Sequence, residues 1–161
     1  MEFTHINPQG YARMVDVSSK PDSERMAKAQ ATVNMKPETL EAIRNGTVKK
    51  GDVLAVAQVA GIMGAKQTAS LIPMCHPLFI SSIDIDFVFD QDNSNIIITS
   101  EVKTNGKTGV EMEAITAVTA AALTIYDMCK AVDRWIEVKS IKLLEKYGGK
   151  SGFQIRREMD E

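Results

Sequence analysis

Hydrophobic and polar residues alternate along four segments of the chain, and this period of two predicts β-strands. In the first segment, small apolar residues occupy one face and polar residues the other, so one face of the sheet is expected to meet solvent. In the last segment the apolar phase slips between Val138 and Ile141, which predicts a β-bulge. The four predicted strands cover residues 27–35, 79–89, 96–104 and 136–146.

Apolar residues with helical spacing fill the stretches between these strands. A short helix is predicted over residues 38–45, with Pro37 at its first turn. A long helix is predicted from Asp52, a residue type suited to a helix N-terminus, to about residue 71. This helix is apolar over most of its surface, so we expect it to be buried on several sides. A third helix, rich in alanine, is predicted over residues 110–132.

The order of elements is strand, helices, strand, strand, helix, strand. It predicts an α+β fold of the ferredoxin-like type, a split βαβ sandwich in which an antiparallel sheet carries helices on one face. We expect a mobile N-terminal arm over residues 1–22, a single domain with all the candidate chemistry over 23–152, and a C-terminal tail over 153–161. The two long helices have more apolar surface than one small sheet can cover. We therefore expect oligomerisation, with covering loops as the alternative.

Composition narrows the classes of protein. The 161 residues suit one domain, and 44% apolar with 25% charged residues is typical of a globular protein. No apolar run is long enough to cross a bilayer and no secretory signal is visible, so we expect a cytoplasmic location without membrane contact. A net charge of −2 and 6% aromatic residues argue against nucleic-acid binding. The two cysteines lack the spacing of a zinc site or a disulfide scaffold.

The C-terminal end of the third predicted helix places an acid beside a base. Asp127 and Lys130 are three residues apart, so their side chains share one helix face. Such pairs are common on solvated helices, but the neighbouring residues between Ile125 and Val132 are largely apolar and leave little room for a solvated face. The pair is therefore a candidate for proton transfer.

A loop pinned by Pro73 and Pro77 holds His76, one of only two histidines, between a predicted helix and a predicted strand. Imidazole can donate or accept a proton near neutral pH, and a histidine held only by packing is the equally weighted alternative. Cys75 has no arrangement of bases that marks it as activated. We expect it to be a small buried side chain rather than a nucleophile.

The glycine-rich stretch Lys107-Thr108-Gly109 before the third helix resembles the end of a phosphate-binding loop. The full Walker spacing is absent, so we reject an ATPase. The helix N-terminus could still bind an anion through its free N–H groups. However, Glu111 and Glu113 occupy the first turn, where acidic residues complement the helix dipole.

Glu113 and Asp127 lie on nearly the same face of this helix. They are fourteen residues apart, which places them ~21 Å from each other along the helix axis. One chain cannot readily bring both to one small substrate. If both serve one site, an antiparallel copy of the helix from a second subunit would supply the missing half, which predicts an active site shared across a two-fold interface.

Four motifs together resemble one known family. In chain order they are Ile72-Pro-Met-Cys-His-Pro, Gly106-Lys-Thr-Gly-Val-Glu-Met-Glu-Ala, Thr124-Ile-Tyr-Asp-Met-Cys-Lys-Ala and Gly148-Gly-Lys-Ser-Gly. Between about residues 14 and 152, the sequence resembles the MoaC family, the cyclic pyranopterin monophosphate synthases of molybdenum cofactor biosynthesis. Four separate motifs in the right order make a chance similarity very improbable.

This resemblance implies a lyase that converts a cyclised dihydroguanosine triphosphate into cyclic pyranopterin monophosphate and releases pyrophosphate. It also implies a ferredoxin-like homohexamer, a trimer of dimers with active sites at the dimer interfaces. No resident cofactor or metal is implied, and magnesium would enter only on the phosphates of the substrate. The alternative is a non-catalytic oligomeric domain that binds nucleotides or anions as a regulator, because ferredoxin-like folds host many such modules.

The motifs also imply roles for residues. By resemblance, the catalytic residues are Asp127, Lys130 and Lys50. Arginine and lysine side chains would hold the phosphates, because charge-assisted hydrogen bonds to phosphate are strong. Met74 stands where leucine is expected, which is a mild exchange. The substrate-binding residues implied by the resemblance are Met74, Cys75, His76, Met112, Glu113, Arg25, Lys66, Lys146 and Lys150.

Overall fold

A five-stranded antiparallel sheet is the frame of the computed structural model, which describes residues 4–157. The strands lie in the order β2-β3-β1-β4-β5. They are β1 (Ser23–Asn34), β2 (Ile80–Asp90), β3 (Asn95–Gly106), β4 (Glu137–Tyr147) and β5 (Gln154–Ile155). The helices are α1 (Pro37–Arg44), α2 (Val53–Lys66), α3 (Thr68–Leu71) and α4 (Glu111–Cys129).

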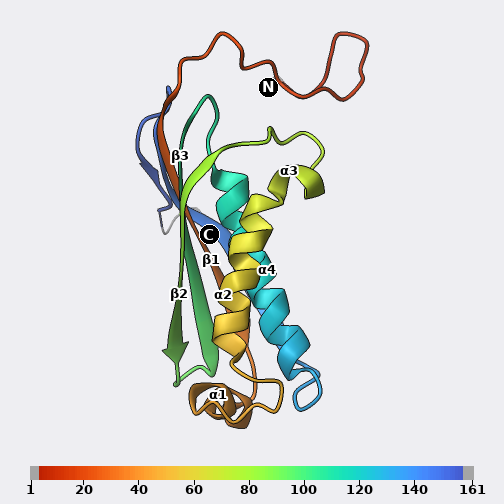
Figure 1. Cartoon of the computed structure of the whole chain (residues 1–161), viewed down its shortest axis with the longest axis vertical. Coiled ribbons are helices and arrows are strands. Elements are labelled where there is room, and N and C mark those ends of the chain that lie inside the picture. Colours follow the sequence, from red (N-terminus) through yellow and green to blue (C-terminus); the bar gives the residue numbers. More distant parts are fainter. Residues whose placement is uncertain (1–3, 158–161) are drawn as a thin grey trace.

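The topology confirms the ferredoxin-like prediction. β1 and β3 occupy the middle of the sheet, and the two long helices α2 and α4 lie side by side on one of its faces (Figure 1). The opposite face is polar, and there Lys28 forms ion pairs with Glu101 at 3.1 Å and with Glu145 at 2.9 Å. The short strand β5, which lies in the segment predicted as a tail, extends the sheet beyond β4.

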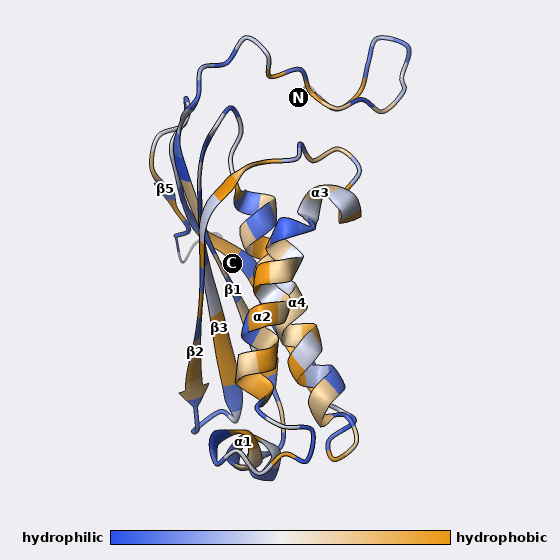
Figure 2. Cartoon of the chain, viewed as in Figure 1, coloured by the Kyte–Doolittle hydropathy of each residue, from blue (hydrophilic) through white to orange (hydrophobic). Residues whose placement is uncertain are grey.

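The molecule is elongated, and α4 runs along its length (Figure 1). The N-terminal end of α4 lies at the upper end of Figure 1, together with α3 and the arm of residues 4–22. Its C-terminal end lies at the lower end, together with α1 and the loop that joins α1 to α2. Figure 2 shows that both long helices are rich in apolar residues between these two ends. Any side chains at opposite ends of α4 are therefore separated by the length of the domain.

Small residues allow the two long helices and the sheet to approach closely. A Cβ atom added at Gly61 of α2 would lie 2.4 Å from Ile85 Cδ1 and 2.9 Å from the carbonyl oxygen of Ala117. One added at Gly64 would lie 2.7 Å from Ala120 Cβ. Alanines of β1 and α4 fill the layer beneath with no exposed surface. The core is therefore a thin, tightly packed layer between the helices and the sheet.

The predicted helix over residues 52–71 is wrong in two respects. It is divided, because α2 ends at Lys66 and the separate turn α3 follows. It is also not buried on several sides, since the buried residues of α2 recur along one face only. On the outer face, Val56, Val59 and Met63 are exposed. The apolar surface predicted from the sequence exists, but residues 4–157 do not cover it.

Other local predictions are confirmed with small shifts in boundaries. Asp52 accepts a hydrogen bond from the backbone N–H of Ala55 at 3.0 Å and so caps α2. The predicted bulge in β4 is present, because the register against β1 shifts between Gln30 and Thr32. Opposite this shift, Ser140 takes a φ of 51°.

The expectation that no apolar run is long enough to cross a bilayer is wrong, because α4 has the length and hydropathy to do so, yet half of its most apolar window is buried inside the protein. It packs against α2 and the sheet, so α4 is a core helix. The predicted cytoplasmic location stays a prediction.

Candidate active site

Asp127, Lys130 and Lys50 lie together at the lower end of the molecule and are called the lower cluster below. Lys130 Nζ lies 2.6 Å from Asp127 Oδ1. Lys50, from the loop after α1, donates a hydrogen bond to the backbone carbonyl of Asp127 at 2.8 Å, and its Nζ lies 4.0 Å from Asp127 Oδ2. Two cations from different segments therefore converge on one carboxylate.

Asp127 and Lys130 stabilise each other's charged form. The hydrogen bond from Lys130 lowers the pKa of the Asp127 carboxyl, and the nearby charge of Lys50 contributes further. The same bond raises the pKa of Lys130. Both shifts favour the charged forms, so the cluster holds a carboxylate beside an ammonium.

The prediction of little solvated surface around this pair is wrong for the single chain. The Asp127 side chain is 62% exposed, and that of Lys130 is 50% exposed. Their apolar neighbours Ile125, Met128 and Cys129 point into the core instead, because they occupy the inner face of α4. The lower cluster thus lies on an open surface.

Asp133, which the sequence analysis did not single out, holds together segments next to the lower cluster. Its side chain is buried and accepts hydrogen bonds from the backbone N–H of Lys36 at 2.8 Å and from the Thr39 hydroxyl at 3.3 Å. These bonds attach the start of α1 to the loop after α4, and α1 leads into the loop that carries Lys50. Its only signal in the sequence is an aspartate directly after a predicted helix, which is too common to interpret.

The upper end contains a cavity of about 440 Å³, called the histidine pocket below. His76 donates a hydrogen bond from Nε2 to the carbonyl oxygen of Val15 at 2.7 Å, which holds the ring against the N-terminal arm. The arm therefore forms one wall of the pocket. The predicted site residues that line it are Met74, Cys75, His76, Met112 and Glu113.

Glu113 and Cys75 are both held in their uncharged forms more strongly than in water. Glu113 is only 4% exposed, and burial raises the pKa of its carboxyl, with a further contribution from the charge of Glu111. Burial likewise raises the pKa of the Cys75 thiol, and Glu113 adds to this shift. A thiol with a raised pKa is a poor nucleophile, which agrees with the expectation that Cys75 is not activated. The expectation that Cys75 is buried is wrong, because its side chain is only half-buried and lines the histidine pocket.

A second cavity of about 630 Å³ adjoins the first and is called the basic pocket below. Its predicted residues are Arg25, Lys146 and Lys150, and the structure brings all three together. Lys146 forms an ion pair with Glu111. The two cavities share the lining residues Lys20, Thr108, Gly109 and Glu111, so they lie next to each other at the upper end.

Sequence analysis missed two cations of the basic pocket, Lys20 and Lys107. Lys107 was noted only as part of an incomplete phosphate loop, and Lys20 lies in the segment predicted as a mobile arm. In the structure, Lys107 Nζ donates to the carbonyl oxygen of Ser18 at 2.8 Å and so connects the arm to the pocket. The hydroxyl of Ser23 also lines this pocket and is buried without a hydrogen-bond partner among residues 4–157.

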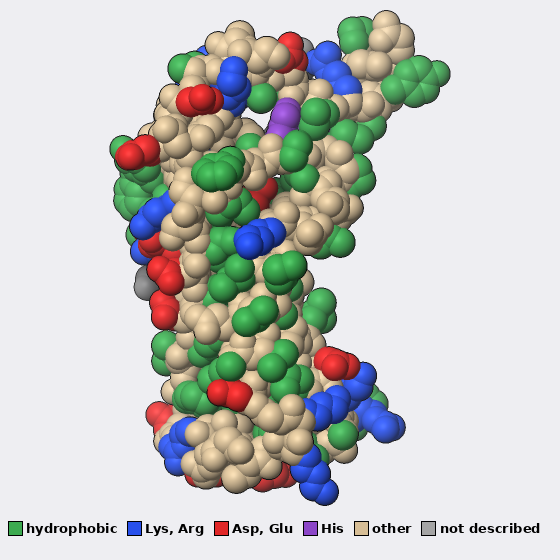
Figure 3. All heavy atoms as spheres, in the orientation of Figure 1, with side chains coloured by type: hydrophobic (Ala, Val, Ile, Leu, Met, Phe, Trp, Pro, Cys, Tyr) green, Lys and Arg blue, Asp and Glu red, His purple; other side chains and the backbone are tan. Residues whose placement is uncertain are grey.

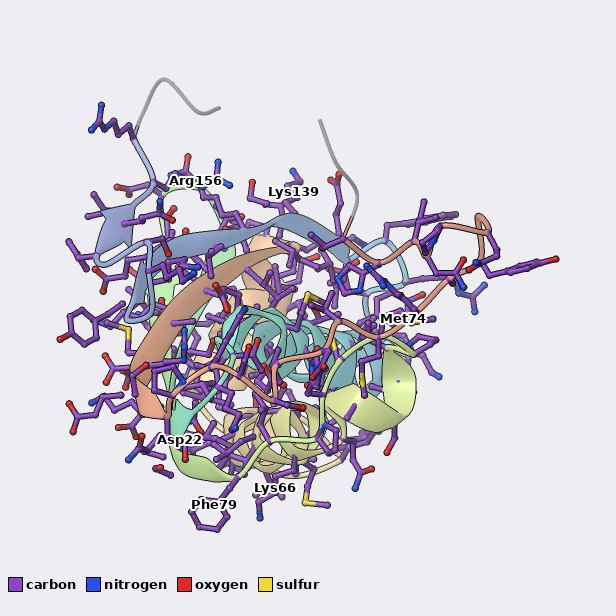
Figure 4. The ribbon with its side chains drawn as sticks, turned by 90° about the horizontal axis from the view of Figure 1, so that it is seen from above. Asp22, Lys66, Met74, Phe79, Lys139 and Arg156 are labelled. Carbon is purple, nitrogen blue, oxygen red and sulfur yellow. The ribbon has the colours of Figure 1, made fainter. Side chains whose placement is uncertain are left out.

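Lys66 joins neither group. It is exposed at the C-terminal end of α2 and lines neither cavity. Figure 4 shows Lys66 on the same side of the molecule as Phe79, whereas Met74 lies on another side. In the described part of the chain no three His, Cys, Asp or Glu side chains are placed to hold a metal ion. Magnesium carried by substrate phosphates stays a prediction.

Apart from Lys66, the predicted site residues therefore form two groups at opposite ends of α4. Glu113 stands in the first turn and Asp127 in the last turn of a 19-residue helix, whose length is ~28 Å at ~1.5 Å per residue. Figure 3 shows histidine at the upper end, and Lys and Arg side chains at both ends of the molecule. The separation agrees with the helix arithmetic made from the sequence.

A ferredoxin-like sheet with a basic cleft at one end and an Asp–Lys pair at the other defines an α+β protein with candidate sites for an anionic ligand and for proton transfer. A model of the MoaC family matches residues 14–149, and the chain belongs to the MoaC family.

Its relatives are curated under one name. The chain is 72% identical over 156 residues to the cyclic pyranopterin monophosphate synthase of Syntrophomonas wolfei, with 97% of this chain and 99% of the relative covered. It is 61% identical over 156 residues to the synthase of a Thermoanaerobacter species, with the same two coverages. It is also 61% identical over 150 residues to that of Clostridium acetobutylicum, with 93% of each chain covered.

Proposed function

We propose that the chain is an enzyme with cyclic pyranopterin monophosphate synthase activity in molybdenum cofactor biosynthesis. The observation that carries this conclusion is the 72% identity over 156 residues to a synthase of that name. The reaction converts a cyclised dihydroguanosine triphosphate into a pyranopterin with a cyclic phosphate, and pyrophosphate leaves.

A direct assay tests the proposal. The purified protein is incubated with the cyclised triphosphate, and pyrophosphate and the pterin product are measured together. We expect both to form in equal amounts. Tight binding of the triphosphate without pyrophosphate release would instead support the alternative of a regulatory nucleotide-binding domain.

The basic pocket is the proposed binding site for the triphosphate. Lys20, Lys107, Lys146 and Lys150 surround a cavity of about 630 Å³, and several positive charges are needed to hold a triphosphate and to stabilise pyrophosphate as it leaves. The adjoining histidine pocket is the proposed site for the part of the substrate that becomes the pterin. Its buried Glu113 and its fixed His76 ring provide donors and acceptors of hydrogen bonds there.

The lower cluster is the proposed site of proton transfer. Ring opening and ring closure both require protons to move, and a carboxylate paired with an ammonium provides an acceptor and a donor side by side. The lowered pKa of Asp127 and the raised pKa of Lys130 keep the first as a carboxylate and the second as an ammonium, the forms that these two roles require before reaction. Lys50 adds a second positive charge, which would stabilise negative charge that develops on the substrate.

One chain does not bring the lower cluster to the basic pocket, so we propose that a second copy completes each site. An antiparallel arrangement about a two-fold axis places the lower end of one chain against the upper end of the other. The exposed apolar residues along the outer face of α2, together with exposed Leu123 of α4, provide a surface for this contact. A homohexamer built as a trimer of such dimers is the proposed assembly. In this assembly, Lys66 would contact only substrate that is bound at a site shared with another copy of the chain.

Mixed dimers test the shared site. Asp127→Asn inactivates the lower cluster and Glu113→Gln inactivates the upper pocket, so a mixed dimer of the two retains one intact site. Random mixing should restore about a quarter of the wild-type activity, because half of the dimers are mixed and each has one of two sites intact. Mixing Asp127→Asn with Lys50→Ala is the matched control. Both changes affect the lower cluster, so no intact site can form, and equal rescue in both mixtures would contradict the shared site.

A further inference from the structure

Arg25 of β1 lies where two loops of the basic pocket meet, and the structure gives it a role other than that of a phosphate ligand. We propose that Arg25 is a positioning residue that locks the end of β3 and the loop after it (residues 105–110) against the loop of residues 148–152. These loops carry Lys107 and Lys150, so the lock sets the spacing of the cations around the pocket. The inference deepens the proposed function, because it takes the basic pocket to be the triphosphate site.

The guanidinium of Arg25 is committed to the first loop. Its Nε donates a hydrogen bond to the carbonyl oxygen of Gly106 at 2.8 Å, and its Nη2 donates one to the carbonyl oxygen of Lys107 at 3.1 Å. Two consecutive carbonyls thus receive two donors from one planar group. A lysine has a single ammonium at the end of a flexible chain, so it cannot reproduce this geometry.

The second loop is pressed against the same guanidinium. Gly148 and Gly149 have φ values of 100° and 71°, in the region that favours glycine. A Cβ atom on Gly149 would lie 2.3 Å from Arg25 Nη1, and one on Gly148 would lie 2.2 Å from the carbonyl oxygen of Glu24. The glycines are therefore needed for close contact with Arg25 and its neighbour as well as for the turn.

These contacts connect Arg25 to the cations of the pocket. Lys150 follows Gly149 directly, and Lys107 supplies one of the two carbonyls that Arg25 binds. Lys107 in turn holds the N-terminal arm through the carbonyl oxygen of Ser18. Loosening Arg25 would therefore displace several groups of the cleft at once, although each would keep its charge.

Substitution by lysine separates positioning from charge. Lysine is itself a good phosphate binder, so Arg25→Lys should retain most substrate affinity if Arg25 acts as a simple charge. If Arg25 is a lock, Arg25→Lys should raise KM by about tenfold, as severely as Arg25→Ala, with a smaller change in kcat. Near wild-type KM in Arg25→Lys would overturn the proposal.

Two glycine variants provide a matched pair. Gly149→Ala places a methyl group against the guanidinium, whereas Gly152 has a similar φ of 61° and meets nothing within 4 Å. Gly149→Ala should raise KM like Arg25→Lys, and Gly152→Ala should have a clearly smaller effect. The effects of Gly149→Ala and Arg25→Lys should also be less than additive in the double variant, because both break one contact. Equal effects of the two glycine variants would contradict the proposal.

Hydrogen exchange tests the lock without any turnover. In Arg25→Lys, backbone amides of residues 105–110 and 148–152 should exchange faster than in the wild type, whereas those of the loop that carries Lys50 should not change. Unchanged exchange in both loops would overturn the inference. A wild-type protein that releases no pyrophosphate would overturn the proposed function and leave this measurement valid.

Discussion

At the scale of residues, the two ends of α4 treat their carboxyl groups in opposite ways. The Asp127 carboxyl is exposed and paired, and Lys130 holds its pKa below the usual range. The Glu113 carboxyl is buried, and desolvation holds its pKa above that range. Pairing thus favours the charged form of Asp127 and burial the protonated form of Glu113, so the two environments shift the pKa values of these carboxyl groups in opposite directions.

Asp127→Asn should abolish turnover while leaving binding intact. It removes the proton acceptor and keeps the shape of the side chain, so pyrophosphate release should fall by at least ~100-fold. Single-turnover assays and calorimetric titration of substrate measure the two effects. Glu41→Gln is the control, because Glu41 forms another exposed ion pair of the same spacing, with Arg44 at 2.9 Å. Turnover within a few-fold of the wild type in Asp127→Asn would contradict the proposed role.

Glu113→Gln should stabilise the protein at neutral pH even as it lowers activity. Because the folded-state pKa of Glu113 is raised, the unfolded chain loses this proton first as the pH rises. The free energy of unfolding therefore falls between the unfolded pKa of about 4.3 and the higher folded pKa. The variant avoids this loss and should gain on the order of 1 kcal/mol at pH ~7 relative to pH ~4.

Urea unfolding of wild type and variant at these two pH values measures the difference. Glu111→Gln is the comparison, because it removes the ion pair with Lys146 and should bring no gain. An equal stability difference for Glu113→Gln at both pH values would show that Glu113 does not cause the effect.

At the scale of elements, the contact between α2 and α4 holds the two functional ends in register. Both helices are rich in small residues, and Gly61 and Gly64 bring the α2 backbone against the side chains and carbonyls of α4. Since α4 carries Glu113 at one end and Asp127 at the other, any shift of this helix would move both groups.

Gly61→Ala should destabilise the protein by roughly 1–3 kcal/mol, the usual cost of overpacking. Alanine is preferred to glycine within helices by about 1 kcal/mol, but its Cβ would lie 2.9 Å from a backbone carbonyl that cannot easily move. Thermal unfolding measures the change. Gly64→Ala should cost less, since its nearest backbone atom would be 3.3 Å away. A stabilised Gly61→Ala would show that propensity outweighs the contact.

Periodicity predicted the four long strands, the two long helices and the bulge, because each depends on residues that are close in sequence. It did not predict that α2 ends at Lys66, because the pattern of apolar and polar residues does not change sharply there. Periodicity also could not predict the hydrogen bonds of Arg25. Arg25 and Gly106 are 81 residues apart, and their contact depends on the pairing of β1 with β3.

At the scale of the whole molecule, the apolar pattern of α2 explains why its predicted burial on several sides was wrong. An apolar helix surface has the same signature whether its own chain or another copy covers it. In the structure Val59 is 61% exposed on that surface, near the middle of α2. An exposed apolar strip between two halves of a site is the arrangement that a two-fold partner would cover.

Val59→Glu should therefore dissociate the assembly and reduce activity together. A carboxylate placed in an apolar contact costs several kcal/mol, so self-association should weaken by at least ~100-fold. Sedimentation velocity gives the mass of the particles, and pyrophosphate release measured over a range of protein concentrations shows whether activity follows association. Val88→Glu is the control, because Val88 is 58% exposed on the open face of the sheet in β2, away from the helices. An active monomer of Val59→Glu would contradict the shared site, since one chain cannot bring Asp127 to the pocket that holds Glu113.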